Sequence, residues 1–357
     1  MEAALQLQYT VLYCLKQLKG ERTVSSIYHL LKGKRSSQTF QDGNMFHLSF
    51  LFGVYKSLRR HDYDKQIETL LNAQLITCLH ENTYILSEVG EKQLNEWEGI
   101  FYFPKHLHGL HYGELGESFW KRLSLIIQTV SNLKQQNVKF IPIQQDTEIT
   151  IWVKRFIMSS SVSREYLAEQ LYKEINVILM NVTSLEATIL VYRLTGYHRI
   201  GYTTDQLGDM MKQDALRVYL LFWGTIHFII QQVQHQKQQF PLLTEIIAYP
   251  NEKADLFSIS TQKTYQLWKQ GRTMDEIARI RKLKVATIED HIVEIALREK
   301  EFQVEHFIEK EKMKQIQNMI EKLQTRKLRI LKQAAGEHVS YFEIRLVLAR
   351  VGGLYET

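Results

Sequence analysis

Hydrophobic residues recur at helical spacing through most of the chain, and one short segment alternates instead. Because positions i, i+3 and i+4 share one face of a helix, we expect four helices in the first hundred residues: 5–18, 25–31, 45–58 and 62–72. The alternating segment, 75–86, combines β-branched and aromatic residues and predicts a β-hairpin that turns at Glu81-Asn82. Helices followed by a hairpin and a closing helix have the order of a winged helix, in which the 45–58 helix is an insertion.

The middle of the chain starts with a loop at 103–116 and continues with amphipathic segments. These predict helices at 118–135, 147–158, 164–180, 185–195, 204–212 and 216–235. The order and lengths of the last three predict a helix-turn-helix-like trio. The long 216–235 segment is apolar on all sides, however, and is expected to be core. The glutamine-rich stretch 231–239, followed by Pro241 and Pro250, indicates a linker before the last domain.

Residues 297–333 have the pattern of a highly charged amphipathic helix, and a final capped helix is expected at 340–350. Only four prolines occur in 357 residues, which favours helices because proline removes a backbone donor. We therefore predict a mainly α protein built from helix-turn-helix units. Its length suggests two or three domains, and its organisation indicates three: a winged-helix-like domain with one small β-hairpin (1–100), a helical middle domain (101–250) and a helix-turn-helix domain (251–357).

The chain carries a formal net charge of +6 and a pI near 9.0, which permits an anionic partner. Residues 1–100 are neutral overall, whereas 251–357 carry +4. The two cysteines, Cys14 and Cys78, are expected in a helix and a buried strand, and the lack of a pairing framework suits a reducing compartment. The apolar run 218–233 is too short and too polar to span a bilayer, and the N-terminus lacks a signal-peptide pattern. We expect a cytoplasmic protein without a membrane partner, associated with the nucleoid if bound to DNA.

Residues 273–292 have the layout of a helix-turn-helix. Thr273 is expected to cap a helix with an acidic first turn, and the small Ala278 lets the next helix approach closely. Leu283 fills the turn between the two helices. The predicted core consists of Ile277, Ala278, Leu283, Thr287, Ile288, His291 and Ile292.

The candidate DNA contacts are cations that would hold the phosphate backbone rather than read bases. They are Arg279, Arg281, Lys282 and Lys284 in the helix-turn-helix, and Arg59, Arg60 and Lys65 in the winged-helix-like domain. We therefore expect weak binding that does not depend on sequence. Glu289 and Asp290 occupy the recognition helix and approach phosphates unfavourably, so contact with protein instead of DNA stays open. For the N-terminal cations, a solvated surface is the alternative.

The C-terminal motifs resemble a known family. The segment from Ser260 through GRTMDEIARIRKLKVATIEDHI to EHVSYFEIRLVLA is similar to the helix-turn-helix domain at the C-terminus of RecQ-type DNA helicases. The chain as a whole, which has no phosphate loop or other motor motif, resembles the stand-alone YpbB-type helix-turn-helix proteins. The resemblance covers about residues 255–350 and implies a helicase partner more than a mechanism.

Two functions are expected from these features. The first is a non-catalytic accessory protein that binds nucleic acid or docks on a RecQ-type helicase in recombination and repair. The alternative is a helix-turn-helix transcriptional regulator. The candidate docking residues on the last helix are Tyr341, Arg345, Leu346 and Arg350, which mix apolar and cationic character. The other interpretation of Leu346 is that it closes the core of its own domain.

Three histidines, His106, His108 and His111, lie with Glu114 in one loop and raise the question of a metal. Their spacing fits no standard site and no cysteine is near, so we expect no metal and no cofactor. A metal-dependent nuclease built on this loop is the weakest of the functions considered.

Overall fold

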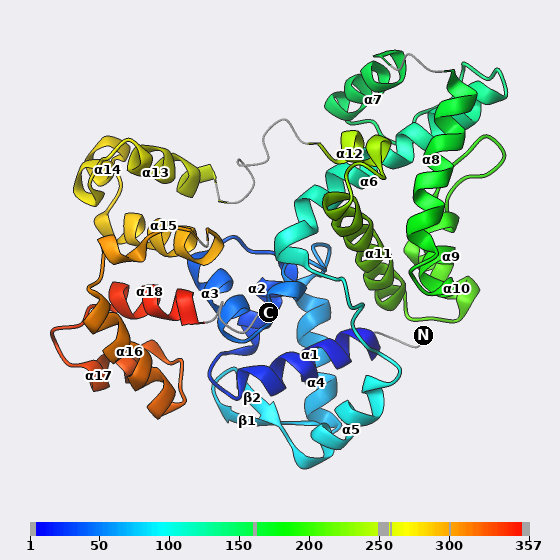
Figure 1. The fold of residues 1–357 in the computed structure, drawn as a ribbon. Helices are drawn as coiled ribbons and strands as arrows, with labels where there is room; N and C mark the ends of the chain where they lie inside the picture. Colours follow the sequence, from blue (N-terminus) through cyan, green and yellow to red (C-terminus); the bar gives the residue numbers. More distant parts are fainter. Residues whose placement is uncertain (1–4, 160–162, 249–256, 258, 300, 352–357) are drawn as a thin grey trace. The chain divides into compact units, whose positions relative to one another are not determined.

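The computed structural model describes residues 5–159, 163–248, 257, 259–299 and 301–351. Within these residues the chain forms eighteen α-helices, two short 3-10 helices and one two-stranded antiparallel hairpin (Figure 1). The predicted mainly α class is therefore confirmed. By its internal contacts the chain divides into two units: residues 1–10 with 94–250, and residues 11–93 with 251–357. The expected division into three domains stays a prediction, but residues 11–93 and the C-terminal segment belong to one unit.

The N-terminal segment has the element order expected for a winged helix. Its elements are α1 (Leu5–Leu18), α2 (Val24–Lys32), α3 (Ser37–Met45), η1 (Ser49–Leu51), α4 (Arg60–Asn72), β1 (Ile76–His80), β2 (Thr83–Leu86) and α5 (Glu88–Glu98). The predicted hairpin is confirmed: Ile76 pairs with Leu86 and Cys78 with Tyr84, and Asn82 takes a positive φ of 57° in the turn. Cys78 is exposed rather than buried.

The helix expected at 45–58 is wrong. Its apolar residues are buried, which explains the helical pattern, but His47 and Gly53 have positive φ values of 54° and 67° that interrupt a helix. Helical structure instead lies upstream in α3, where the Ser36 side chain accepts a hydrogen bond from the Thr39 N–H and caps the first turn.

The other unit contains a helical bundle. Its elements are α6 (Gly109–Lys134), α7 (Thr147–Ser159), α8 (Arg164–Leu179), α9 (Ser184–Arg193), α10 (Thr204–Met211), α11 (Ala215–His235) and α12 (Pro241–Ile247). The predicted α7 to α11 are confirmed to within one or two residues, and α11 lies in the core as expected. Two expectations are corrected. The loop at 103–116 ends at His108, whose ring caps α6, and the expected linker contains α12. Pro250 lies outside the described residues.

The C-terminal segment belongs to the same unit as residues 11–93. Its elements are α13 (Ile259–Lys269), α14 (Met274–Arg281), α15 (Val285–Arg298), η2 (Val304–His306), α16 (Lys310–Leu323), α17 (Leu328–Ala335) and α18 (Tyr341–Val351). The single helix expected within 297–333 is two helices, because Gln324 ends α16 with a φ of 49°. The final predicted helix is confirmed as α18.

Each unit contains a helix-turn-helix of closely similar construction. In both, a threonine begins an eight-residue helix through a capping box, and a lysine ends that helix in the left-handed conformation. The residues correspond at a spacing of seventy: Thr203 with Thr273, and Lys212 with Lys282. The trio expected at 185–235 is therefore present as α9, α10 and α11.

Candidate nucleic-acid interface

The C-terminal helix-turn-helix is set up by local hydrogen bonds. The Thr273 N–H donates to the Glu276 carboxylate at 2.8 Å, and the Glu276 N–H donates to Thr273 Oγ1 at 3.3 Å. These bonds satisfy two donors at the start of α14 and hold the Glu276 carboxylate at the positive end of the helix. Lys282, with a φ of 52°, turns the chain out of α14, so that α15 starts at Val285.

The seven predicted core residues lie on the inner face of the motif and differ in how deeply they are buried. Ile277, Ala278, Ile288, His291 and Ile292 are buried, and Leu283 and Thr287 are half-buried. The His291 imidazole lies 2.9 Å from Thr264 Oγ1 on α13. Burial lowers the pKa of His291, and the nearby Arg281 guanidinium lowers it further, which favours the neutral ring.

Arg281 is half-buried and takes part in this packing. Its guanidinium donates to the Ser260 carbonyl oxygen at 2.7 Å, to Ser260 Oγ at 2.8 Å and to Thr264 Oγ1 at 2.5 Å. These bonds fasten α14 to α13. A DNA contact by Arg281 stays a prediction, but its donors already have partners within the fold.

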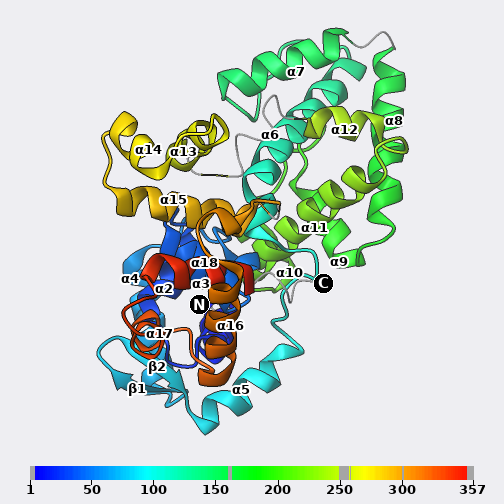
Figure 2. The ribbon, with the colours of Figure 1, turned by 60° about the vertical axis from the view of Figure 1, so that its left-hand side comes forward.

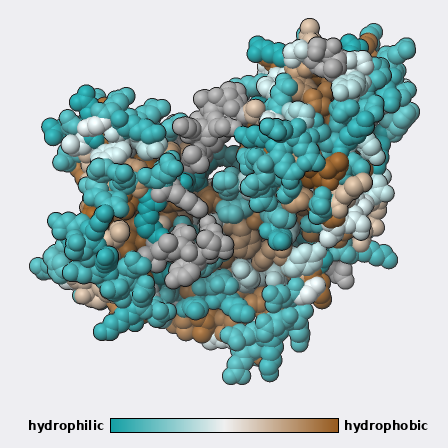
Figure 3. Space-filling model, viewed as in Figure 1, coloured by the Kyte–Doolittle hydropathy of each residue, from teal (hydrophilic) through white to brown (hydrophobic). Residues whose placement is uncertain are grey.

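The remaining three cations of the motif are exposed together. Arg279, Lys282 and Lys284 line a shallow hollow at the turn between α14 and α15, with Asp275 as its single carboxylate. Lys284 occupies the N-cap of α15 and, among the described residues, its side chain makes no capping hydrogen bond. The surface over α14 is mostly hydrophilic (Figure 3). Exposed cations beside an uncapped helix start suit a phosphate group.

The body of the recognition helix is covered on several sides. α15 packs against α13, α14, α18 and α3 (Figures 1 and 2). Residues 291–296 are all buried. The Arg298 guanidinium lies 4.4 Å from the centre of the Phe40 ring on α3. From Val285 to Asp290, α15 is exposed or half-buried except at Ile288, so only its N-terminal part is open to a partner and the rest cannot line a major groove.

The two adjacent acids of α15, Glu289 and Asp290, are both partly exposed, and one of them forms an ion pair within the fold. Asp290 forms an ion pair with Arg345 of α18 at 2.6 Å, and both Glu289 and Asp290 are half-buried. The sequence left open whether these carboxylates contact DNA or protein. For Asp290, the structure shows a contact within its own unit.

The N-terminal cations are paired with acids of their own helix. Arg59 lies 2.6 Å from Asp62, and Arg60 lies 2.8 Å from Asp64. The hydrogen bond from Arg59 lowers the pKa of Asp62. Lys65 is exposed on α4. Since two of the three cations have adjacent carboxylates, this surface offers phosphates less net charge than the helix-turn-helix turn does.

The four docking residues expected on α18 have different surroundings. Leu346 is fully buried in the core with Ile288 and Ile292, Arg345 pairs with Asp290, and Arg350 donates to the carbonyl oxygens of Glu299 and Phe302. Tyr341 is 49% exposed. Leu346 is therefore corrected to a core residue, which is the alternative that the sequence had left open.

The histidines at the start of α6 have structural contacts. His106 lies 2.9 Å from Gln231, and the His108 N–H donates to Nδ1 of the buried His227 at 3.1 Å. Across the part of the chain that the structure describes, no three His, Cys, Asp or Glu side chains lie close enough to hold a metal ion. Nor does any helix in these residues have the length and apolar character needed to cross a membrane.

Two features of this surface had no signal in the sequence. The first is the helix α3, which covers α15. Its own apolar pattern is weak, and the stronger apolar pattern of the buried 45–58 segment led to a helix being predicted there instead. The second is the ion pair between Asp290 and Arg345. These residues lie on different helices, so the helical spacing of the sequence does not connect them. Both arise from contacts between distant parts of the chain.

The arrangement of α13, α14 and α15 defines a helix-turn-helix protein, a class whose usual role is nucleic-acid binding. Residues 260–348 match a family described as a helix-turn-helix domain. The chain is 36% identical to Protein YpbB of Bacillus subtilis (strain 168) over 341 residues, which cover 95% of this chain and 96% of that protein. The chain belongs to the YpbB family. No solved structure matches it.

Proposed function

We propose that this protein is a non-catalytic accessory factor that binds the nucleic-acid backbone without reading its sequence. The observation that carries the proposal is the exposed trio of Arg279, Lys282 and Lys284 beside the covered body of α15. Cations at the turn reach phosphates, whereas a buried recognition helix has few side chains left for base edges. In this proposal the protein acts in the cytoplasm, on the nucleoid when DNA is bound, and needs no cofactor.

The alternative function is a sequence-specific regulator, which would need a larger exposed surface on α15 than the fold leaves. A regulator presents its recognition helix to the major groove and discriminates bases through several side chains. Here the sides of α15 pack against α3, α13 and α18. The covered helix favours the accessory role over the regulator.

The test is binding of the full chain to labelled DNA of several sequences, measured by fluorescence anisotropy at increasing salt. We expect a log–log salt slope of about −2 to −5, since few phosphates are neutralised. Lys282→Glu combined with Lys284→Glu should weaken binding equally for every sequence. The matched control is Lys314→Glu with Lys322→Glu on the exposed face of α16. A salt-tolerant complex with one preferred sequence would instead identify a regulator.

We further propose that the protein acts with a RecQ-type helicase in recombination and repair. The support is the sequence resemblance of the C-terminal segment to a domain fused to such helicases. Of the four docking residues, Tyr341 is the exposed one, and it would make the contact. Calorimetric titration of the full chain with a purified helicase tests this, with Tyr341→Ala as the variant and Tyr166→Ala, exposed on α8, as the control. No heat at tens of micromolar would remove the helicase from the proposal.

A further inference from the structure

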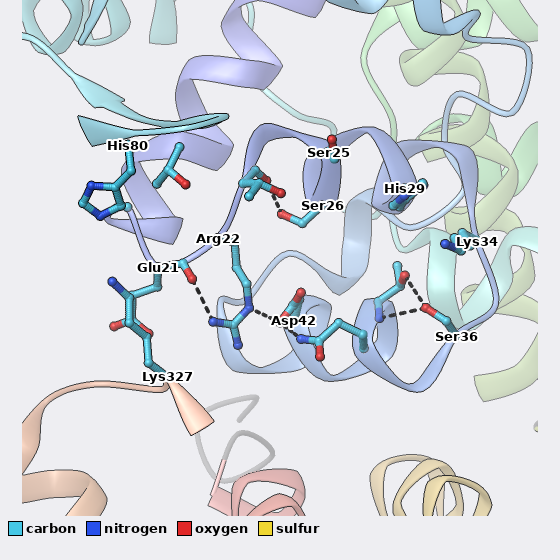
Figure 4. A pocket seen from close by; sticks show the side chains of 15 residues that line it. Glu21, Arg22, Ser25, Ser26, His29, Lys34, Ser36, Asp42, His80 and Lys327 are labelled. Carbon is cyan, nitrogen blue, oxygen red and sulfur yellow. Dashed lines mark hydrogen bonds and ion pairs between the residues drawn. The ribbon is translucent and has the colours of Figure 1, made fainter. Parts of the chain in front are cut away.

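A polar pocket of about 520 Å³, drawn in Figure 4, lies in the unit that contains the C-terminal helix-turn-helix and shares no lining residue with the hollow at its turn. Its walls come from α2 and the loop before it, from α3 and the loop before it, from the hairpin, and from the segment before α17. The lining side chains are mostly hydroxyl-bearing or basic: Thr23, Ser25, Ser26, Ser36, Thr39, Thr83, Arg22, His29, Lys34, His80 and Lys327. Fourteen of the fifteen lining residues lie within 20–83, and the C-terminal segment contributes Lys327.

Both carboxylates of the pocket already accept hydrogen bonds from within the fold. Asp42 accepts hydrogen bonds from Arg22 at 2.7 Å and from Gln38 at 2.8 Å. Glu21 accepts one from the backbone N–H of Arg326 at 2.9 Å. Arg22 and Arg326 also lie over the same aromatic ring, that of Phe46, at 5.2 and 5.5 Å. These contacts form a floor in which Arg22 offsets the charge of Asp42, while Glu21 keeps its own negative charge.

Basic groups occupy both sides of this floor. In Figure 4, Lys34 with His29 lies at one side of the pocket and Lys327 with His80 at the other, and Ser25 and Ser26 lie between them. Two helices of nine residues also begin here: α2 after Thr23 and α3 after Ser36. The N-terminal ends of helices carry partial positive charge, which adds to that of the two lysines. Such a pocket suits a ligand with separated negative charges.

We propose that this pocket binds consecutive phosphate groups of a nucleic-acid strand. None of the fifteen lining residues is Phe, Tyr or Trp, so the pocket lacks a large aromatic platform for a base, and its lysines and helix ends favour the backbone. The inference rests on the proposed nucleic-acid function and gives it a second contact region beside the helix-turn-helix turn. Free polyphosphates have the same chemistry and are the other source of such a ligand.

The experiment compares the full chain with the double variant Lys34→Glu, Lys327→Glu. A labelled 30-nucleotide single strand is titrated by anisotropy at several salt concentrations. We expect about a tenfold or greater loss of affinity and a salt slope shallower by about 1.4, because two phosphate contacts to a single strand are removed. Lys34→Arg with Lys327→Arg should retain binding. Lys92→Glu with Lys105→Glu makes the same charge change at exposed positions outside the pocket and controls for net charge.

The other outcomes separate this inference from the proposed function. If Lys282→Glu with Lys284→Glu weakens binding but the pocket variant does not, the pocket is excluded and the function stands. If the unchanged protein binds no DNA at low salt, both are overturned. If the pocket variant loses only its binding of tripolyphosphate, measured by calorimetry, the ligand is a free polyphosphate and the nucleic-acid assignment is wrong. Unchanged thermal unfolding of each variant shows that the fold is intact.

Discussion

Asp290 on the recognition helix receives the guanidinium of Arg345 from α18 at 2.6 Å. A carboxylate that disfavours phosphate binding thus serves to hold the last helix against the helix-turn-helix. The Arg345 side chain is largely covered, with 15% exposed, whereas that of Asp290 is 46% exposed. The pair is therefore a partly screened contact within the fold.

The coupling between these two residues can be measured with a double-mutant cycle. Asp290→Ala, Arg345→Ala and the double variant should give a coupling free energy of about 0.5–1 kcal/mol in urea unfolding, because solvent screens the exposed carboxylate. Additive effects of the two substitutions would show that the ion pair contributes nothing to stability.

Phe40 should stabilise a helix more than two hundred residues away in sequence. Its ring is 2% exposed and lies against both Phe52 and the Arg298 guanidinium. Phe40→Ala removes this packing at a cost of about 3 kcal/mol. Hydrogen exchange should then accelerate in α15 as well as in α3, with α11 in the other unit as the internal control. If α15 keeps its protection while α3 loses it, the two helices are not coupled.

Gly90 is required for the closing helix to approach the hairpin. A Cβ at this position would lie 1.9 Å from the Leu75 carbonyl oxygen. Gly90→Ala should therefore destabilise the protein by about 2 kcal/mol or more, since backbone must move. Gly99→Ala is the matched control, because a Cβ there meets nothing within 4 Å among the described residues. Equal thermal unfolding of the two variants would contradict this role of Gly90.

His227 should make stability depend on mildly acidic pH. Burial, with His108 and His111 nearby, lowers its pKa from 6.5 to about 3. The folded state thus holds the neutral ring, and the unfolded state binds a proton first. The stability that the neutral His227 ring preserves is fully present above about pH 6.5. Below that, the free energy of unfolding falls by about 1.4 kcal/mol per pH unit as the pH drops towards 3.

The measurement is urea unfolding at pH 7, 6 and 5. His227→Asn retains an acceptor for the His108 N–H but has no group that titrates here, so its stability should fall less steeply. His61→Asn, at an exposed position on α4, should leave the wild-type slope unchanged. Identical slopes for the wild type and His227→Asn would rule out this role.

Short-range signals in the amino-acid sequence specify the individual elements. Thr273 and Glu276 form a capping box three residues apart, and the alternation at 75–86 produces the hairpin, because these signals act within one or two turns of chain. The positions of the buried helix-turn-helix residues follow from the same helical spacing. The class of protein, and the presence of Lys282 and Lys284 at its turn, therefore follow from the sequence alone.

Packing between distant segments sets which of these residues remain available to a partner. Arg281 and Arg345 look like surface cations in the sequence, but Ser260 and Asp290 engage them across helix interfaces. The covering of α15 by α3 joins segments separated by most of the chain. Periodicity reports which face of a helix is apolar but not which distant segment packs there, since that choice depends on the shape and charge of the whole unit.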